Sequence, residues 1–303
     1  MNKIPKRLFM MSATALSVSN SSVLKRLSPI VEQSKDHHSP DGGFRNPWPS
    51  FSPRDFSDVF KWQLSRKKGP KEPSAPAETV EIDWEKIQRL YNGEASPSTK
   101  FSLTWLGHAA FLMTAPGVRI LFDPCLSDRC SPMSFMGPKR IQKLPFELSA
   151  LPPIDCVVIS HNHYDHLDLP ALEKITHKNT YFFVPLGVKK LLISEGYEHV
   201  VECDWWDQYQ LSVGGKSIQI TCSPCQHFSS RSLFDRNETL WSSWIVKANS
   251  GSFYFAGDTG YKAVSENVTP EIEAALPVCP AFKTIGKEYG KEQCNLISQV
   301  LLI

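Results

Sequence analysis

The sequence predicts an α/β fold in which packed sheets are flanked by helices. From residue 100 onward, short runs rich in β-branched and aromatic residues alternate with turn residues. Helical patterns interleave with these runs at 170–177 and 188–195. The expected strands lie at 102–105, 110–113, 119–122, 156–160, 180–184, 217–221, 241–246 and 253–256. A mixture of hairpins and strand–helix units is typical of layered sheets with helices on the outside.

Composition narrows the class of protein. The chain has 303 residues, of which 41% are hydrophobic and 21% charged, so disordered and fibrous classes are excluded. A net charge of +2 gives no overall attraction to nucleic acid, and no nucleic-acid-binding motif accompanies it. Eight cysteines are too few for a disulfide scaffold in a chain of this size. No run of 18 apolar residues occurs, so we expect no transmembrane helix.

Changes in residue composition along the chain divide it into four expected segments. Residues 1–40 form a basic, Ser-rich tail, and the apolar run 8–18 leaves three interpretations open for residues 1–31: secretory, mitochondrial, or simply disordered. Residues 41–99 are expected to wrap the core and to include a linker at 67–78 and a short helix near 84–91. The main domain covers 100–290, and 291–303 is a divergent tail.

The string His-Asn-His-Tyr-Asp-His at 161–166 directly follows an apolar, strand-like run. In extended geometry His161 and His163 project to the same side, because side chains alternate along a strand. Asp165 and His166 then point elsewhere once the chain turns. The string therefore offers two ligands to each of two adjacent metal positions. Imidazole nitrogen and carboxylate oxygen suit zinc and similar divalent ions.

Further ligands must come from distant strands. His227 and Asp258 both stand at the ends of β-type runs beside turn residues, where loop-borne ligands are usually found. Asp258 is placed to bridge two ions about 3.5–4 Å apart, an arrangement that can polarise an ester. His108 is either structural or a neighbour of the ligands. Cys222 and Cys225 form an isolated C-x-x-C, which is a weak indication of redox chemistry.

The HxHxDH string, the later His227 and the Gly-Asp-Thr-Gly at 257–260 resemble the metallo-β-lactamase superfamily, whose fold is an αββα sandwich. Shorter strings narrow the resemblance: Asn-Pro-Trp-Pro at 46–49, Thr-Trp-Leu-Gly-His-Ala-Ala-Phe-Leu at 104–112, Asp-Pro at 123–124 and Gly-Pro-Lys-Arg at 137–140. They resemble the family of N-acyl-phosphatidylethanolamine-hydrolysing phospholipases D, from about residue 42 to 290.

The resemblance implies a zinc-dependent phosphodiesterase that uses a metal-bound hydroxide. Its products would be an N-acylethanolamine and phosphatidic acid. By position, one zinc takes His161, His163 and His227, the other takes Asp165 and His166, and Asp258 bridges them. Asp165 and Asp258 are thereby catalytic as well as metal-binding. The resemblance also places Tyr164 in the phosphate pocket.

The family pattern ends with one more zinc-binding His, and no His follows His227 in this sequence. We therefore expect a sandwich that lacks its last strand or strands and helix, and a second zinc site that is incomplete. Two alternatives to the phosphodiesterase stay open. One is an inactive or lipid-binding isoform, and the other is a different metallo-hydrolase of the same fold.

The expected partners are a phospholipid substrate and a membrane surface, and the resemblance adds a homodimer. Basic and aromatic residues at 61–68 suit contact with an anionic surface. We expect no nucleic-acid partner. The expected location is cytoplasmic with peripheral membrane association.

Overall fold

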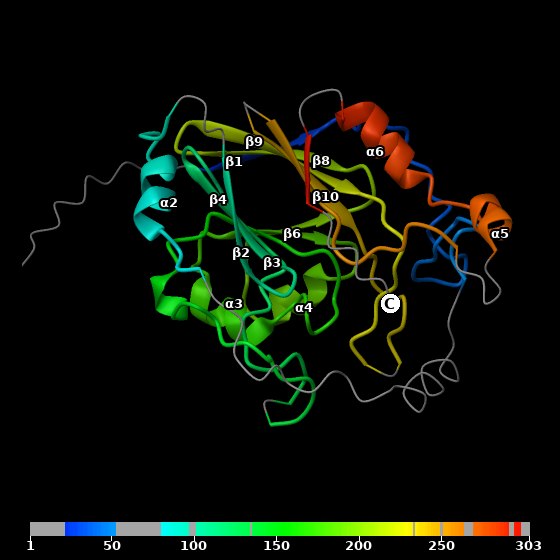
Figure 1. Ribbon diagram of the computed structural model, residues 1–303, viewed down its shortest axis with the longest axis horizontal. Helices are drawn as coiled ribbons and strands as arrows, with labels where there is room; N and C mark the ends of the chain where they lie inside the picture. Colours follow the sequence, from blue (N-terminus) through cyan, green and yellow to red (C-terminus); the bar gives the residue numbers. More distant parts are fainter. Residues whose placement is uncertain are drawn as a thin grey trace, which may run out of the picture.

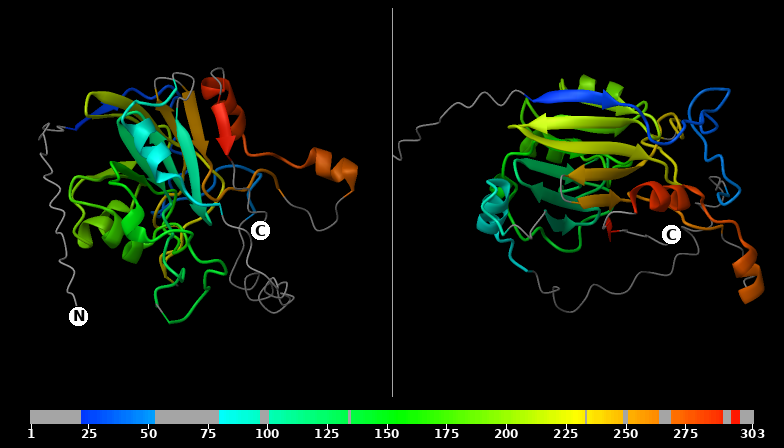
Figure 2. Two further views of the ribbon diagram at one scale, coloured as in Figure 1. Left: turned by 60° about the vertical axis from the view of Figure 1, so that its left-hand side comes forward. Right: turned by 90° about the horizontal axis from the view of Figure 1, so that it is seen from above.

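The computed structural model describes residues 22–52, 80–96, 101–133, 135–232, 234–248, 251–263, 269–290 and 294–297. Two six-stranded sheets stack face to face in this part of the chain, and helices lie outside them (Figures 1 and 2). The predicted α/β sandwich is confirmed, and each of the eight expected strands is present with boundaries shifted by a few residues.

The first sheet carries the parallel part of the fold. Its strands, in spatial order, are β2 (Ser102–Gly107), β3 (Ala110–Ala115), β4 (Val118–Phe122), β5 (Cys156–Val158), β6 (Tyr181–Pro185) and β7 (Val200–Cys203). The first three strands form antiparallel hairpins, whereas β4 to β7 are parallel. Helix α3 (Leu169–Ile175) connects β5 to β6, and helix α4 (Lys189–Ser194) connects β6 to β7, as is usual for parallel neighbours.

The second sheet is antiparallel except at one edge. Its strands, in spatial order, are β1 (Val23–Leu27), β8 (Gln208–Val213), β9 (Lys216–Ser223), β10 (Ser243–Ala248), β11 (Gly251–Phe255) and β12 (Cys294–Ile297). Helix α6 (Ala281–Tyr289) lies against this sheet, where the Tyr289 hydroxyl accepts a hydrogen bond from Gln208. The short α5 (Pro270–Ala275) precedes α6.

The main core lies between the sheets. Alternate residues of β9, such as Ile218 and Ile220, point into it, and the rings of Phe122 and Phe253 meet across it at 5.1 Å. A second core lies on the outer face of the first sheet, where Leu121 packs with residues of α3 and α4 such as Leu172 and Leu192. Burial on both faces explains why the central strands are continuously apolar.

Helices expected from the sequence form close to their predicted places. Helix α2 (Trp84–Tyr91) occupies the expected segment, and the Asp83 side chain caps it by accepting from the backbone N–H of Lys86. Asp168 caps α3 in the same way through the N–H of Ala171. The linker expected at 67–78 and the basic stretch 61–68 lie outside the described residues.

The segment 22–40, which the sequence assigns to a tail, is structured. Strand β1 pairs antiparallel with β8 and extends the second sheet. The physical reason is non-local, because β8 lies about 180 residues further along and offers an edge that a short strand can join. Residues 1–21 lie outside the described part, so the interpretations of the run 8–18 stay predictions.

A cluster around Asp204 fixes the segment that follows β1. One carboxylate oxygen of Asp204 lies 2.6 Å from Nε2 of His37, and the other lies 2.9 Å from Nε2 of His38. The ammonium of Lys35 also contacts this carboxylate. The His37 ring is buried and stacks on Trp205 with the centroids 4.1 Å apart. These contacts attach the chain to the corner between β7 and β8.

The tail 291–303 contributes β12, which runs parallel to β11 at the edge of the second sheet. The expectation that the last strand or strands and helix of the sandwich are missing stays a prediction. Among the described helices, none combines the length and the apolar character needed to cross a membrane.

Candidate metal centre

The side chains predicted to bind metal meet at one end of the sandwich. The loop that carries His161 to His166 follows β5, His227 follows β9, and Asp258 follows β11. One sheet therefore supplies four of the candidate ligands, and the other sheet supplies two. Loops beyond the carboxyl ends of parallel strands are the usual place for such sites.

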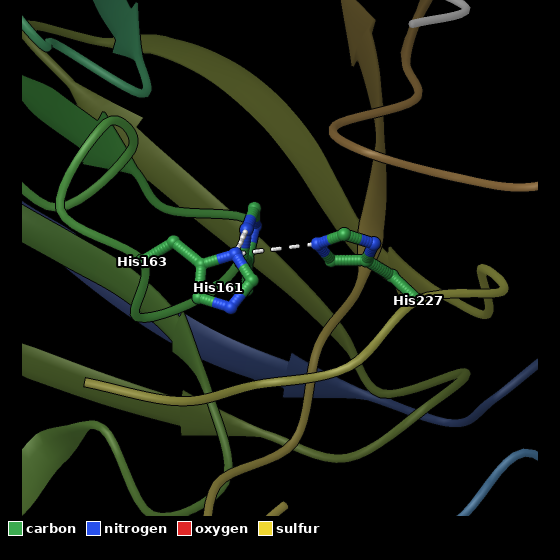
Figure 3. A group of neighbouring side chains, drawn as sticks. All are labelled: His161, His163 and His227. Atoms are coloured by element: carbon green, nitrogen blue, oxygen red, sulfur yellow. Dashed lines mark hydrogen bonds between the residues drawn. The ribbon is translucent and has the colours of Figure 1, made fainter. Parts of the chain in front are cut away.

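Three imidazoles form the first group (Figure 3). Nε2 of His161 lies 2.8 Å from Nδ1 of His163, and Nε2 of His227 lies 3.3 Å from the same nitrogen. The possible ligand atoms of the three rings all lie within 4.8 Å of one another. Three converging histidines match the protein ligand set of a tetrahedral zinc site with one open position.

The second group joins Asp165 and His166 to His108. Nε2 of His108 lies 3.1 Å from Oδ2 of Asp165, and Nε2 of His166 lies 3.8 Å from it. The possible ligand atoms of these three residues also fall within 4.8 Å of one another. His108 adopts a positive φ of 49°, which is uncommon for a residue other than glycine. The predicted pair thus has a third potential donor close by.

Asp258 lies between the two groups. Its Oδ2 is 3.3 Å from Nε2 of His166 and 3.8 Å from Nε2 of His227. A carboxylate within reach of a ligand from each group can bridge two metal ions. The bridging role that the sequence suggested for Asp258 fits this geometry.

Two buried polar atoms at this point have no hydrogen-bond partner. They are Nε2 of His166, whose side chain has 0% exposure, and Oδ1 of Asp258. Leaving such atoms unpaired costs free energy, and proteins seldom do so without a functional reason. A nitrogen lone pair and a carboxylate oxygen directed into a shared space suit a divalent cation. The residues present therefore fit a metal ion.

Asp123, at the end of β4, orients His166. Its Oδ2 lies 2.6 Å from Nδ1 of His166, while its Oδ1 accepts from the N–H of Ser160 at 2.7 Å. The carboxylate consequently holds the Nδ1 side of the imidazole and leaves Nε2 facing the other ligands. Partners of this kind fix the tautomer and orientation of metal-binding histidines. The sequence motif Asp-Pro at 123–124 was visible, but its role required the structure.

Close packing brings the Asp258 loop against the loop after β5. Gly257 has a φ of +59°, and a Cβ at this position would lie 2.6 Å from Cβ of Ser160. Only glycine fits both the backbone conformation and this contact. The two sheets approach each other here without an intervening side chain.

Burial keeps the first three imidazoles neutral. It lowers the pKa of His163 to about 4 and that of His227 to about 3, and it lowers the pKa of His161 as well. Neutral imidazole is the form that binds metal, so at neutral pH these rings need to release no proton to a metal.

Arg231 supports the metal loop from outside and was not singled out from the sequence. Its Nη1 donates to the carbonyls of Asn162 and Leu167, each at 2.9 Å. The guanidinium also lies over the Tyr164 ring, 4.0 Å from the centroid. The only sequence signal for this role is its place four residues after His227, on a loop that returns to the site.

A cavity of about 960 Å³ opens beside the second group. His108, His163, Tyr164 and Asp165 contribute to its wall. The rest of the wall combines cationic with apolar side chains: Lys139, Arg140 and Lys143 with Trp105, Ile141 and Leu144. Such a lining suits an anionic group that is attached to apolar chains.

Residues 118–278 match the family model described as the beta-lactamase superfamily domain. The chain is 42% identical over 187 residues to the N-acyl-phosphatidylethanolamine-hydrolyzing phospholipase D 1 of Caenorhabditis elegans, covering 58% of this chain and 52% of that protein. It is 39% identical over 160 residues to the mitochondrial N-acyl-phosphatidylethanolamine-hydrolyzing phospholipase D of Saccharomyces cerevisiae, covering 52% of this chain and 34% of that protein. The matched part thus spans about half, or less, of these relatives.

A third relative extends the similarity beyond the phospholipases. A UPF0173 metal-dependent hydrolase of Methanopyrus kandleri is 30% identical over 217 residues, covering 66% of this chain and 81% of that protein. The range matched by the family model, 118–278, includes every segment that carries a predicted ligand, from His161 to Asp258.

Proposed function

The chain belongs to the β-lactamase superfamily of metal-dependent hydrolases, and from this premise we propose that it is a zinc-dependent phosphodiesterase that hydrolyses N-acyl-phosphatidylethanolamine. The products are an N-acylethanolamine and phosphatidic acid. The names of two relatives support this substrate. Because those relatives are about twice as long as the matched part or longer, the substrate is a proposal about this chain rather than a property taken over from them.

The observation that carries the proposal is the position of the metal ligands beside the cavity. Asp165 and His163 belong to the ligand groups and also to the cavity wall. A phosphodiester held there has its phosphorus next to the ligands, while its acyl chains lie along Trp105 and Ile141. Simple water-soluble esters need no such apolar surface.

Different residues of the cavity bind different sides of the substrate phosphate. Arg140 and Lys143 attract the phosphate, and Arg140 is held in place because its Nη2 donates to the Cys125 carbonyl at 2.6 Å. Tyr164, fixed under Arg231, limits the far side of the phosphate site. When bound by the two groups, zinc ions supply Lewis acidity that activates water and offsets negative charge on the phosphoryl oxygens.

The reaction itself is a displacement at phosphorus. The oxygen of water forms a bond to phosphorus, and the bond from phosphorus to the ethanolamine oxygen breaks. The departing oxygen takes up a proton and leaves as the N-acylethanolamine. The diacylglycerol part retains the phosphate as phosphatidic acid. No side-chain nucleophile is needed.

Exposed side chains near the cavity favour action at a membrane surface. Phe135 and Ile141 are 76% and 80% exposed, and Met136 lies between them on the same loop. Lys139 adds positive charge to this loop. Apolar tips flanked by cations are typical of peripheral membrane contacts. We therefore propose peripheral association through this loop, and the homodimer stays an expectation.

The test is hydrolysis by the purified, zinc-loaded chain. We expect N-acyl-phosphatidylethanolamine in phosphatidylcholine vesicles to yield N-acylethanolamine and phosphatidic acid, both detected by mass spectrometry. Asp165→Asn should reduce the rate at least about a hundredfold. Arg140→Met should raise KM, whereas Lys216→Met, at the first residue of β9, serves as the matched control.

Other results would favour a different function for this chain. Turnover of a lactone without turnover of the phospholipid would favour a different metallo-hydrolase. A folded, zinc-loaded chain that hydrolyses neither compound would overturn the enzymatic proposal and favour a lipid-binding role.

A further inference from the structure

Two cysteines lie side by side at the cavity, and one of them, Cys130, lines its wall. Cys125 follows β4 and is fully buried, and Cys130 lies five residues further along and is partly exposed. Their sulfur atoms are 3.1 Å apart. Among the cysteines whose side chains the structure describes, Cys130 alone is not buried.

The backbone holds both sulfurs in this position. The Cys125 carbonyl accepts from Arg140 at 2.6 Å, and the N–H of Cys130 donates to the Pro138 carbonyl at 3.2 Å. Between them, the N–H of Ser127 donates to the Asp168 carboxylate at 2.7 Å. The sulfurs need to approach by only about 1 Å to reach the length of a disulfide bond.

The two thiols differ in reactivity. The hydrogen bond from the Cys125 thiol lowers the pKa of Cys130 to about 7, and the same contact raises the pKa of Cys125. Cys130 therefore carries a substantial thiolate fraction at neutral pH. An accessible thiolate next to a second thiol is the usual arrangement of an oxidisable pair.

Access comes from the cavity. Cys130 lines the same cavity as His108 and Asp165, so a small solute that enters the cavity reaches this sulfur. Cys222 and Cys225, the pair that the C-x-x-C spacing suggested, are buried instead, and burial raises the pKa of both thiols. The reactive pair is therefore not the one with the familiar sequence spacing.

We propose that Cys125 and Cys130 are a redox modification site that hydrogen peroxide converts to a disulfide in the folded protein. The Cys130 thiolate attacks one peroxide oxygen, the O–O bond breaks, and the hydroxide that leaves becomes water. The sulfenic acid formed on Cys130 is then attacked by the Cys125 sulfur. A second water leaves as the S–S bond forms, so two thiols and one peroxide give one disulfide and two waters.

The site stands independently of the proposed function. Neither sulfur belongs to the groups of potential metal ligands, so oxidation should leave the metal content unchanged. The disulfide would close the short loop 125–130 beside the cavity and remove the thiolate charge of Cys130 from the cavity wall. The oxidation state of the two cysteines would thus alter the charge of the cavity wall.

The experiment uses mass spectrometry on the full chain. Trypsin cleaves after Arg129 and Lys139, so Cys125 and Cys130 fall in two different peptides, 120–129 and 130–139. After brief treatment with peroxide and blocking of the remaining thiols, a non-reduced digest should contain these two peptides joined. We expect the joined pair to form at least about tenfold faster than any other cysteine is oxidised.

Three variants make the result specific. Cys130→Ser should abolish the joined peptides, Cys225→Ser should leave them unchanged, and Cys125→Ser should allow a sulfenic acid on Cys130 to be trapped with dimedone. Elemental analysis should give the same metal content before and after oxidation. The proposal is overturned if the peptides join only in denaturant, or if Cys130 is oxidised no faster than the buried thiols.

Discussion

Oδ2 of Asp123 lies 2.6 Å from Nδ1 of His166, and both side chains are completely buried. Asp123 directly follows β4 of the first sheet, and His166 belongs to the loop after the neighbouring parallel strand β5. Two side chains with no exposure are thus in contact directly behind the candidate metal centre. The contact determines which imidazole nitrogen is available to a metal.

Replacing Asp123 should weaken metal binding without removing a ligand. In Asp123→Asn the negative charge behind His166 is lost, and the imidazole becomes a poorer and less well oriented donor. We expect the affinity for the second metal ion to fall about 10–100-fold, measured by titration against a competing chelator. Asp155→Asn, which changes a partly buried carboxylate, is the control away from the site. Equal affinity in the two variants would contradict the prediction.

Removing the metal should destabilise the fold. The ligands come from loops of both sheets, so an ion bound to them stabilises the folded state only. Dialysis against a chelator is expected to lower the melting temperature, and zinc at about a hundred times its Kd should restore about 2.7 kcal/mol. Thermal unfolding followed by circular dichroism measures the change. A melting temperature that is the same with and without chelator would count against a metal centre here.

His108 should contribute to the second group. Its Nε2 is 3.1 Å from Oδ2 of Asp165. The backbone of His108 has a positive φ, and the Trp105 indole donates a hydrogen bond of 2.8 Å to the His108 carbonyl. We expect His108→Ala to lower the zinc content of the purified protein, because the Asp165 carboxylate loses a partner and the group loses a donor. Elemental analysis provides the measurement. His199→Ala, which removes a ring stacked on Tyr181, should keep the full content.

The cluster around Asp204 should stabilise the fold in a pH-dependent way. Burial would raise the pKa of Asp204, but hydrogen bonds from His37 and Lys35 outweigh burial and hold that pKa well below its usual value. A depressed pKa in the folded state means that the contribution is present above about pH 4 and is lost as the pH falls below it. We expect Asp204→Asn to lower the free energy of unfolding at pH 7 by about 1–3 kcal/mol.

Urea unfolding at several pH values tests this expectation. The difference between the wild type and Asp204→Asn should shrink as the pH is lowered from 7 to 3. Asp36→Asn changes an exposed carboxylate in the same segment and should have little effect at any pH. A difference that stays constant with pH would show that the cluster acts through packing rather than through charge.

Local patterns in the sequence were sufficient to predict much of the fold. Strands with apolar runs and clear turns, such as β5 and β9, were predicted because their pattern and their boundaries are both local. Strands β1, β7, β8 and β12 were missed. Residues such as Gln208 and Gln210 in β8 carry no strand pattern, and pairing with β9 and β1 defines the strand. Tertiary pairing overrides weak local propensity in such segments.

The residues of the candidate site also fall into two kinds, those that the sequence predicts and those that only the structure identifies. His161, His163, Asp165 and His166 could be predicted together because they lie within six residues in the sequence. Asp123, His108 and Arg231 each act on that string from at least about 40 residues away, and their roles depend on which loops meet. The Asp-Pro pair at 123–124 does not by itself reveal a role for Asp123, because that role depends on its contact with His166.

The contact of Gly257 with Ser160 joins the loops of the two sheets at the point where their ligands converge. The distance between His227 and His161 is therefore a measure of how closely the two layers are stacked. A substitution in the middle of the sandwich, for instance at Phe122 or Phe253, would alter that spacing without touching a ligand. In this architecture, metal affinity reports on the integrity of the hydrophobic interior, and variants at a distance from the site can be inactive simply because they cannot retain their ions.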